Sequence, residues 1–171
     1  PAGGYLWFPH GSSIPRQATT IPTSILAGGD LVFEYKMEQQ GQAISCDGPD
    51  LLNEGTMMQY NTGFGWIDMP ANFPPFNSNP APYTNIAYFC PLNPQLQSFT
   101  TWNQYSIPIP AAAWSANTSF RWIQTSASST QYDFWGLENL NIVTTPIGGG
   151  GTYSWTNLST GTITAGQTIT V

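Results

Sequence analysis

The stretch from Cys46 to Tyr60 reads CDGPDLLNEGTMMQY and carries the strongest fold signal in the chain. Its first part places three of the nine acidic residues, Asp47, Asp50 and Glu54, in one short loop. Its second part is an apolar strand that runs into a turn at residues 61–65 (NTGFG) and then into another strand. The two glycines of this turn supply the positive φ angles that a tight hairpin needs. An acidic loop followed by a β-hairpin is therefore predicted.

The rest of the chain also has the character of an all-β protein. Short runs rich in Val, Ile, Thr and aromatic residues are cut by Pro and Gly, and no window has apolar residues at helical spacing over three turns. Residues 31–37 alternate between apolar and mostly polar positions, and further strands are expected at 102–109, 117–125 and 134–143. Four tryptophans on these strands are expected in the core, and Arg121 is expected to pair or stack within the structure. The four are Trp66, Trp102, Trp122 and Trp135.

The composition limits the classes of function. Only 7% of residues are charged, against about 25% in a typical soluble domain, and the net charge is −6. Three fixed cations cannot neutralise a run of phosphates, so a nucleic-acid partner is not expected. No segment approaches the roughly 18 apolar residues that cross a bilayer, so membrane insertion is not expected either. Low charge with many Thr, Asn and aromatic residues favours an extracellular location.

A change of composition marks a boundary near the C-terminal end. The stretch from Thr144 to Pro146 is followed by four consecutive glycines at 148–151, and then by two Thr-rich segments with no core of their own. Two strands are not stable alone in water. We therefore expect one domain over residues 1–145, with residues 146–171 forming a linker and the first strands of another β-module.

The order of motifs resembles a known family over about Gly4 to Val143, the reelin-type subrepeat. The resemblance lies in the segments Gly4 to Leu6, Arg16 to Thr20, Leu31 to Tyr35, Cys46 to Gly55, Gln59 to Tyr60, Trp102 to Pro110, Asn117 to Trp122 and Trp135 to Ile142. It implies an antiparallel jelly-roll β-sandwich, similar in shape to MAM domains and carbohydrate-binding modules. It also implies a place in very large surface proteins of gliding bacteria, where such units are joined to immunoglobulin-like repeats. The tail after residue 146 is similar to the start of such a repeat.

Calcium is the metal that the acidic residues suggest, because it takes six to eight oxygen ligands at once. Glu138, on the last strand of the domain, is the first candidate ligand. The resemblance implies a structural calcium site there, although the family usually has Asp at this position. Asp47, Asp50 and Glu54 are expected to form a second cluster. The alternative is a solvated acidic loop in which Asp47 or Asp50 caps turn amides.

Cys46 and Cys90 are the two cysteines, and an even pair in an extracellular chain permits a disulfide. The bond would stabilise the fold by about 4 kcal/mol in the entropy model. The alternative is two unrelated buried thiols.

A ligand-binding surface is expected in the segment from Pro70 to Pro94, which contains seven prolines. Long loops in compact domains are often functional. Its aromatic side chains are the candidates for an exposed contact with polysaccharide: Phe73, Phe76, Tyr83 and Tyr88.

An enzyme is not expected. The sole histidine, His10, has no nucleophile motif around it, and the Cys and His residues do not have the spacing of a zinc site. A pair such as Glu54 with Glu138 or Asp133 could serve a glycosidase, but the sequence does not show whether they meet. Together with the resemblance to reelin-type subrepeats, this favours a non-catalytic module of a bacterial surface adhesin, with neighbouring modules and surface polysaccharide as partners. The alternative is a carbohydrate-binding module of a secreted glycan-degrading enzyme.

Overall fold

A computed structural model describes residues 5–9, 12–38, 47–77, 79–90 and 99–144, together with two short strands near the C-terminal end. No α-helix occurs among these residues. The elements are β1 (Leu6–Phe8), β2 (Arg16–Thr19), β3 (Thr23–Ile25), β4 (Gly29–Met37), β5 (Thr56–Asn61), β6 (Ile67–Asp68), η1 (Tyr83–Asn85), β7 (Tyr88–Phe89), β8 (Asn103–Pro108), η3 (Ala111–Ala113), β9 (Ser115–Gln124), β10 (Trp135–Thr144), β11 (Ser154–Thr156) and β12 (Ile163–Ala165).

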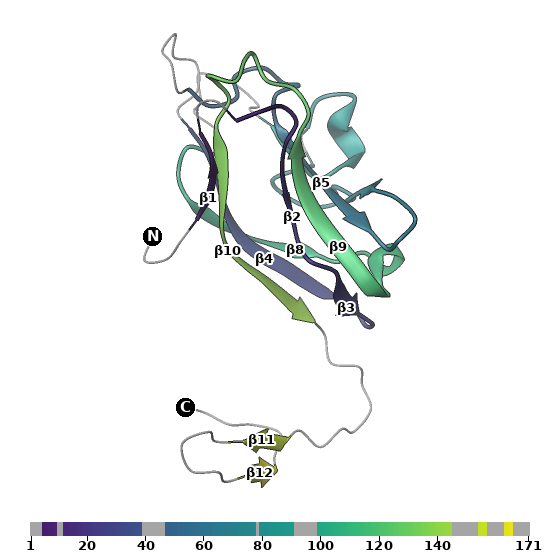
Figure 1. Cartoon of the computed structure of the whole chain (residues 1–171). Coiled ribbons are helices and arrows are strands. Elements are labelled where there is room, and N and C mark those ends of the chain that lie inside the picture. Colours follow the sequence, from purple (N-terminus) through teal and green to yellow (C-terminus); the bar gives the residue numbers. More distant parts are fainter. Residues whose placement is uncertain are drawn as a thin grey trace.

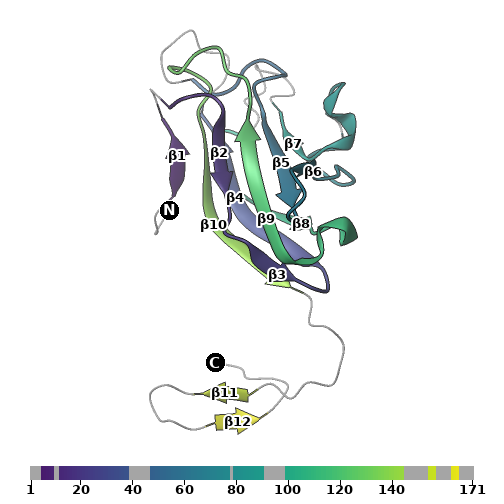
Figure 2. The same ribbon diagram turned by 45° about the vertical axis from the view of Figure 1, so that its right-hand side comes forward.

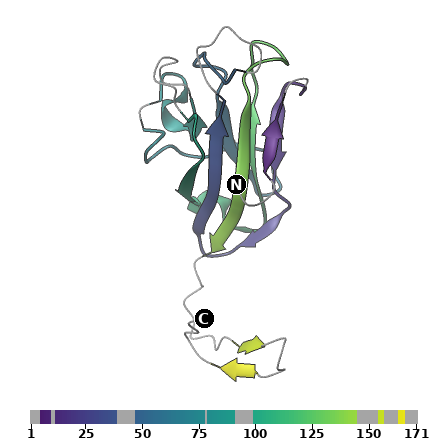
Figure 3. The same cartoon turned by 90° about the vertical axis from the view of Figure 1, so that its left-hand side faces the viewer.

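Two antiparallel sheets pack face to face (Figures 1 and 2). The first has the strand order β1-β10-β4-β8, and the second has the order β2-β9-β5-β6 with β3 paired to β9 and β7 paired to β5. Figure 3 shows β10 between β4 and β1 in the first sheet. The predicted all-β class and antiparallel β-sandwich are therefore confirmed.

The alternation in β4 places its apolar residues in the core. Leu31, Phe33, Tyr35 and Met37 are fully buried, and Phe33 lies 4.9 Å from Trp122 of the opposite sheet, measured between ring centroids. Fully burying a side chain of this size contributes about 1.5–3 kcal/mol. The same period-2 pattern that predicts the strand thus also produces the contact between the two layers.

The predicted hairpin is present as β5 and β6. Tyr60 pairs with Ile67, and the Oδ1 atom of Asn61 accepts hydrogen bonds from the amides of Gly63 and Gly65 at 2.7 and 3.2 Å. Both glycines have positive φ angles, of 108° and 117°. The glycines are therefore needed for backbone conformation rather than for space.

Two of the four tryptophans expected in the core lie elsewhere. Trp122 and Trp135 are fully buried, whereas Trp66 and Trp102 are partly exposed. Trp66 precedes β6 at the sheet edge, where the Arg121 guanidinium lies 4.2 Å from its ring centroid, so the expected stacking of Arg121 is confirmed. A strand propensity does not determine which face a side chain takes at an edge.

The Pro-rich segment is more buried than expected for a contact surface. Phe76 and Tyr88 are 0% and 2% exposed, Phe73 packs against the core, and Tyr83 stacks on Tyr88 with ring centroids 4.0 Å apart. The expectation that these four aromatic side chains are exposed is therefore wrong for Phe76 and Tyr88. Apolar side chains in this segment pack against the sandwich. The free energy gained by burying them offsets the conformational entropy lost when a long loop is ordered.

Strands β11 and β12 pair with each other in antiparallel register. They lie within the two Thr-rich segments, whose other residues lie outside the described part of the chain. The domain boundary and the immunoglobulin-like character of the tail stay predictions. No helix in the described part of the chain combines the length and the apolar character needed to span a bilayer.

Candidate functional site

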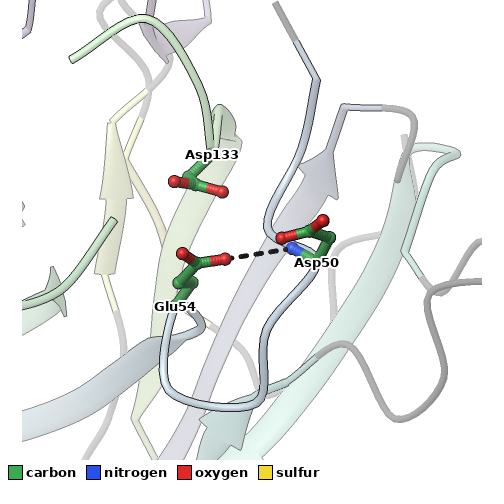
Figure 4. A group of neighbouring side chains, drawn as sticks. All are labelled: Asp50, Glu54 and Asp133. Carbon is green, nitrogen blue, oxygen red and sulfur yellow. Dashed lines mark hydrogen bonds between the residues drawn. The ribbon is translucent and has the colours of Figure 1, made fainter. Parts of the chain in front are cut away.

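Asp50, Glu54 and Asp133 form the candidate site. One carboxylate oxygen of each lies within 4.8 Å of the other two, and Figure 4 shows all three side chains pointing toward one another. Asp50 and Glu54 come from the loop before β5, and Asp133 comes from the segment that leads into β10. Glu54 and Asp133 are 2% and 1% exposed, while Asp50 is half-buried.

The acidic loop is folded around the side chain of Glu54. Its Oε2 atom accepts hydrogen bonds from the amides of Asp50 and Leu51 at 3.3 and 2.9 Å, and the amide of Glu54 donates to Leu51 O. Figure 4 marks the first of these bonds. The Glu54 carboxylate thus closes a turn by binding the amides at its start, and this turn explains the spacing of Asp50 and Glu54 in the sequence.

The second loop is joined to the first by hydrogen bonds. Ser128 donates from Oγ to Glu54 Oε1 at 2.7 Å and from its amide to Asp133 Oδ2. The amides of Asp133 and Phe134 both donate to Asp47 O, at 2.9 and 3.1 Å. The two loops are therefore joined by one side-chain and two main-chain hydrogen bonds between residues that are far apart in the sequence.

Asp47 adds a fourth carboxyl group to this region. Asp47 is 8% exposed, and its Oδ1 atom is buried without a hydrogen-bond partner. Burial raises the pKa of Asp47 to about 6, and the neighbouring charges of Asp50 and Glu54 add to this effect. A buried carboxylate oxygen without a donor is costly unless it is protonated or binds a cation.

The same physical causes act on Asp133 and Asp50. Burial raises the pKa of Asp133 to about 7, with a further contribution from the charge of Glu54. The pKa of Asp50 is also raised, first by burial and then by its interaction with Glu54. Near neutral pH the site therefore either retains protons or requires a positive charge.

A buried hydrogen-bonded pair, Arg16 and Gln124, lies beneath the acidic loops. Arg16 is 1% exposed and donates from Nη1 to Tyr132 O at 2.8 Å and to Asp133 O at 2.6 Å. Burial lowers the pKa of Arg16, and the charge of Asp133 opposes this shift. Because the guanidinium binds main-chain oxygens, the three carboxylates remain available for another cation.

Glu138 is not one of the three clustered residues. It is 4% exposed and lines a separate hollow of about 260 Å³ with Leu6, Trp122 and Leu137. Its Oε2 atom and the Trp122 Nε1 atom are buried without hydrogen-bond partners. A calcium role for Glu138 stays a prediction.

The predicted disulfide partner Cys46 lies outside the described residues, as does His10. Cys90 is buried, its Sγ atom lies 3.6 Å from Leu52 O, and burial raises the pKa of its thiol to about 12. The Cys46–Cys90 bond therefore stays a prediction.

Of the three clustered acids, Asp50 and Glu54 are metal ligands predicted from the sequence, and the predicted ligand Asp47 lies in the same region, whereas Asp133 is predicted only as part of a catalytic pair. The signal that could have found Asp133 is its position directly before an aromatic strand, where loop ends of a sandwich gather. The site also depends on Arg16 and Gln124, whose roles were not anticipated.

The family model for Reelin subrepeat B matches residues 2–143. The chain therefore belongs to the reelin subrepeat family, which confirms the resemblance found in the sequence. A search of curated proteins gave no significant match.

Proposed function

We propose that this chain is a non-catalytic, calcium-binding module of a large extracellular protein. The observation that carries the proposal is the close approach of three acidic side chains, two of them fully buried, at the junction of two loops. Like charges this close repel one another in the protein interior, where water screens them poorly. A bound divalent cation removes that repulsion.

The donor set fits calcium. All the groups that converge are hard oxygen atoms, which calcium prefers, and no His or Cys belongs to the cluster of described residues. Asp50, Glu54 and Asp133 would hold the ion, and the orphaned Oδ1 atom of Asp47 is a further acceptor in the same region. The ion would supply positive charge and join the two loops.

The burial of the acids favours a structural role over hydrolysis. A glycosidase needs its carboxyl pair in contact with the sugar. Glu54 and Asp133 are 2% and 1% exposed, so a sugar ring cannot reach them without displacement of the loops. Glu138, the other acid considered for catalysis, is also buried.

The cellular setting of the proposal is a bacterial surface adhesin that acts in attachment or gliding motility. Membership of the reelin subrepeat family and the low content of charged residues support an extracellular place. In this setting the module links neighbouring modules of the same polypeptide and contacts surface polysaccharide. The second candidate is a carbohydrate-binding module of a secreted glycan-degrading enzyme. It is favoured by the exposed or partly exposed aromatic side chains of Tyr5, Trp7 and Trp102 beside the sheet β1-β10-β4-β8.

Thermal unfolding with and without calcium tests the proposal. A ligand present at about 100 times its Kd stabilises the native state by about 2.7 kcal/mol, which raises Tm on the order of 5–10 °C for a chain of this size. The rise should be absent in Asp133→Asn and present in the matched variant Asp68→Asn, whose carboxylate lies in exposed β6. A Tm that calcium leaves unchanged in the wild type would contradict a calcium site.

A further inference from the structure

A group of three aromatic side chains lies on the outer face of the sheet β1-β10-β4-β8. Tyr5, Trp7 and Trp102 contact one another, with ring centroids 6.5 Å apart for Tyr5 and Trp7, 5.8 Å for Tyr5 and Trp102, and 6.4 Å for Trp7 and Trp102. Tyr5 is 53% exposed, and both tryptophans are partly exposed. We call these three residues the aromatic platform.

Gly136 makes the platform sterically feasible. It pairs with Trp7 across β1 and β10 and with Lys36 across β10 and β4. A Cβ atom at Gly136 would lie 2.4 Å from Trp7 Cε3, which is closer than two non-bonded carbon atoms can approach. The missing side chain therefore lets the Trp7 indole lie over β10 and reach toward Trp102.

Alternation in β1 sends its residues to both faces of the sheet. Phe8 packs against Trp135 of the core at 4.5 Å between ring centroids, so the preceding Trp7 is directed to the outer face. The platform is thus formed by residues that the core does not use. Tyr and Trp are enriched at interfaces, and a contiguous exposed apolar patch is typical of a binding surface.

Two charged side chains complete the hollow. Lys36 Nζ lies 5.6 Å from the Trp7 ring centroid and 3.7 Å from Glu38 Oε2. Together with the platform they line a hollow of about 220 Å³. Their side chains are 23% and 36% exposed, so a donor and an acceptor remain accessible to a ligand beside the rings.

We propose that this hollow binds one sugar ring of a neutral polysaccharide. The C–H face of a pyranose packs on an aromatic ring, Lys36 donates to hydroxyl oxygens, and Glu38 accepts from hydroxyl groups. The ion pair carries no net charge and the chain carries −6, so a polyanion gains nothing from this surface. This inference rests on the extracellular location in the proposed function. It assigns the polysaccharide contact to the outer face of the sheet β1-β10-β4-β8.

The size of the hollow favours a sugar over a protein partner. Stable protein interfaces bury about 800 Å² on each partner. Five side chains around about 220 Å³ form a smaller site, below the roughly 300–1,000 Å³ of pockets for drug-sized ligands. This volume suits a single ring of a chain that continues across the surface.

Affinity electrophoresis and calorimetry of the full chain test the proposal with three soluble probes: a neutral β-glucan, a neutral galactomannan and the polyanion alginate. Wild type should bind at least one neutral probe, and Trp102→Ala should lose at least tenfold in affinity. Trp102→Phe should retain most of the binding. The matched control is Phe64→Ala, which removes a side chain that is 96% exposed and distant in sequence from the platform.

Each contrary outcome overturns the proposal. These outcomes are no binding to either neutral probe, tighter binding to alginate, and neutral binding that Trp102→Ala leaves unchanged. Self-association that Trp102→Ala abolishes would instead assign the platform to an interface between copies of this chain. Calcium-dependent melting of the wild-type protein separates the two proposals, since a normal calcium response without binding to either neutral probe contradicts only the sugar site.

Discussion

The buried side chains of Arg16 and Gln124 are joined by a hydrogen bond of 3.1 Å, in which Arg16 Nη1 donates to Gln124 Oε1. Gln124 also donates from Nε2 to Glu54 O at 2.7 Å and to Asp133 O at 3.0 Å. The pair thus contacts both loops that carry the acidic cluster. Their main-chain positions, and with them the candidate calcium ligands, are determined from within the core.

Replacing Gln124 by alanine should lower the free energy of unfolding by about 3 kcal/mol. The change leaves buried donors and acceptors without partners, and each such group costs about 1–3 kcal/mol. Urea unfolding measures the effect. Gln17→Ala, at an exposed position of β2, is the control and should change stability by less than about 0.5 kcal/mol. Equal effects of the two substitutions would contradict a special role for Gln124.

Without divalent cations, the free energy of unfolding should depend on pH. The pKa of Asp133 is raised from 3.8 to about 7 and that of Asp47 from 3.8 to about 6. Between about pH 4 and 7 the native state therefore binds more protons than the unfolded chain, so the free energy of unfolding contributed by these groups falls as pH rises.

Saturating calcium should weaken this dependence, because the ion takes the place of the protons. Urea titrations at pH 5 and pH 8, each with calcium and with chelator, measure it. Asp133→Asn should also reduce the fall in the free energy of unfolding between pH 5 and pH 8. A metal-free protein whose stability rises from pH 5 to pH 8, with a greater rise in wild type than in Asp133→Asn, would show that the site prefers its ionised form without a cation.

Gly136→Ala should displace Trp7 and weaken the pairing of β1 with β10. The added methyl group meets Trp7 Cε3 and also lies 2.8 Å from Leu6 O. Overpacking of this kind costs about 1–3 kcal/mol. Acrylamide quenching of tryptophan fluorescence should increase, and binding to neutral polysaccharide should fall. Unchanged quenching and binding would mean that the platform does not depend on the missing side chain.

Phe76→Ala tests the interpretation of the Pro-rich segment as part of the core. Phe76 is fully buried and contacts Phe89 with ring centroids 4.9 Å apart, so its truncation should cost about 3–5 kcal/mol. Phe64→Ala, in the exposed hairpin turn, should be nearly neutral. If Phe76→Ala were as stable as wild type, the segment would not pack as described.

Local sequence rules predict those parts of the fold that depend on neighbouring residues. The alternation in β4 and the glycines of the β5–β6 hairpin predict the strand, its buried face and the turn, because these features depend on neighbouring residues alone. The order of motifs predicts the family. The acidic loop also directs attention to Asp50 and Glu54.

The remaining features depend on contacts between distant residues. Asp133 joins Glu54 only because two loops meet at one end of the sandwich, and the burial of Phe76 depends on how a long segment folds back on the sheet. The sequence predicts Trp102 in the core because it falls on an expected strand, yet it lies in the platform on the outer face. Periodicity gives alternation, but the register and the edges decide which face is buried.

Isothermal titration of calcium into the wild-type chain and into Asp133→Asn is the most direct measurement of the central claim. The account expects saturable calcium binding by the wild type and its loss in Asp133→Asn, with both proteins folded by circular dichroism. No binding by the wild type, or equal binding by the two proteins, would contradict a calcium site formed by Asp50, Glu54 and Asp133.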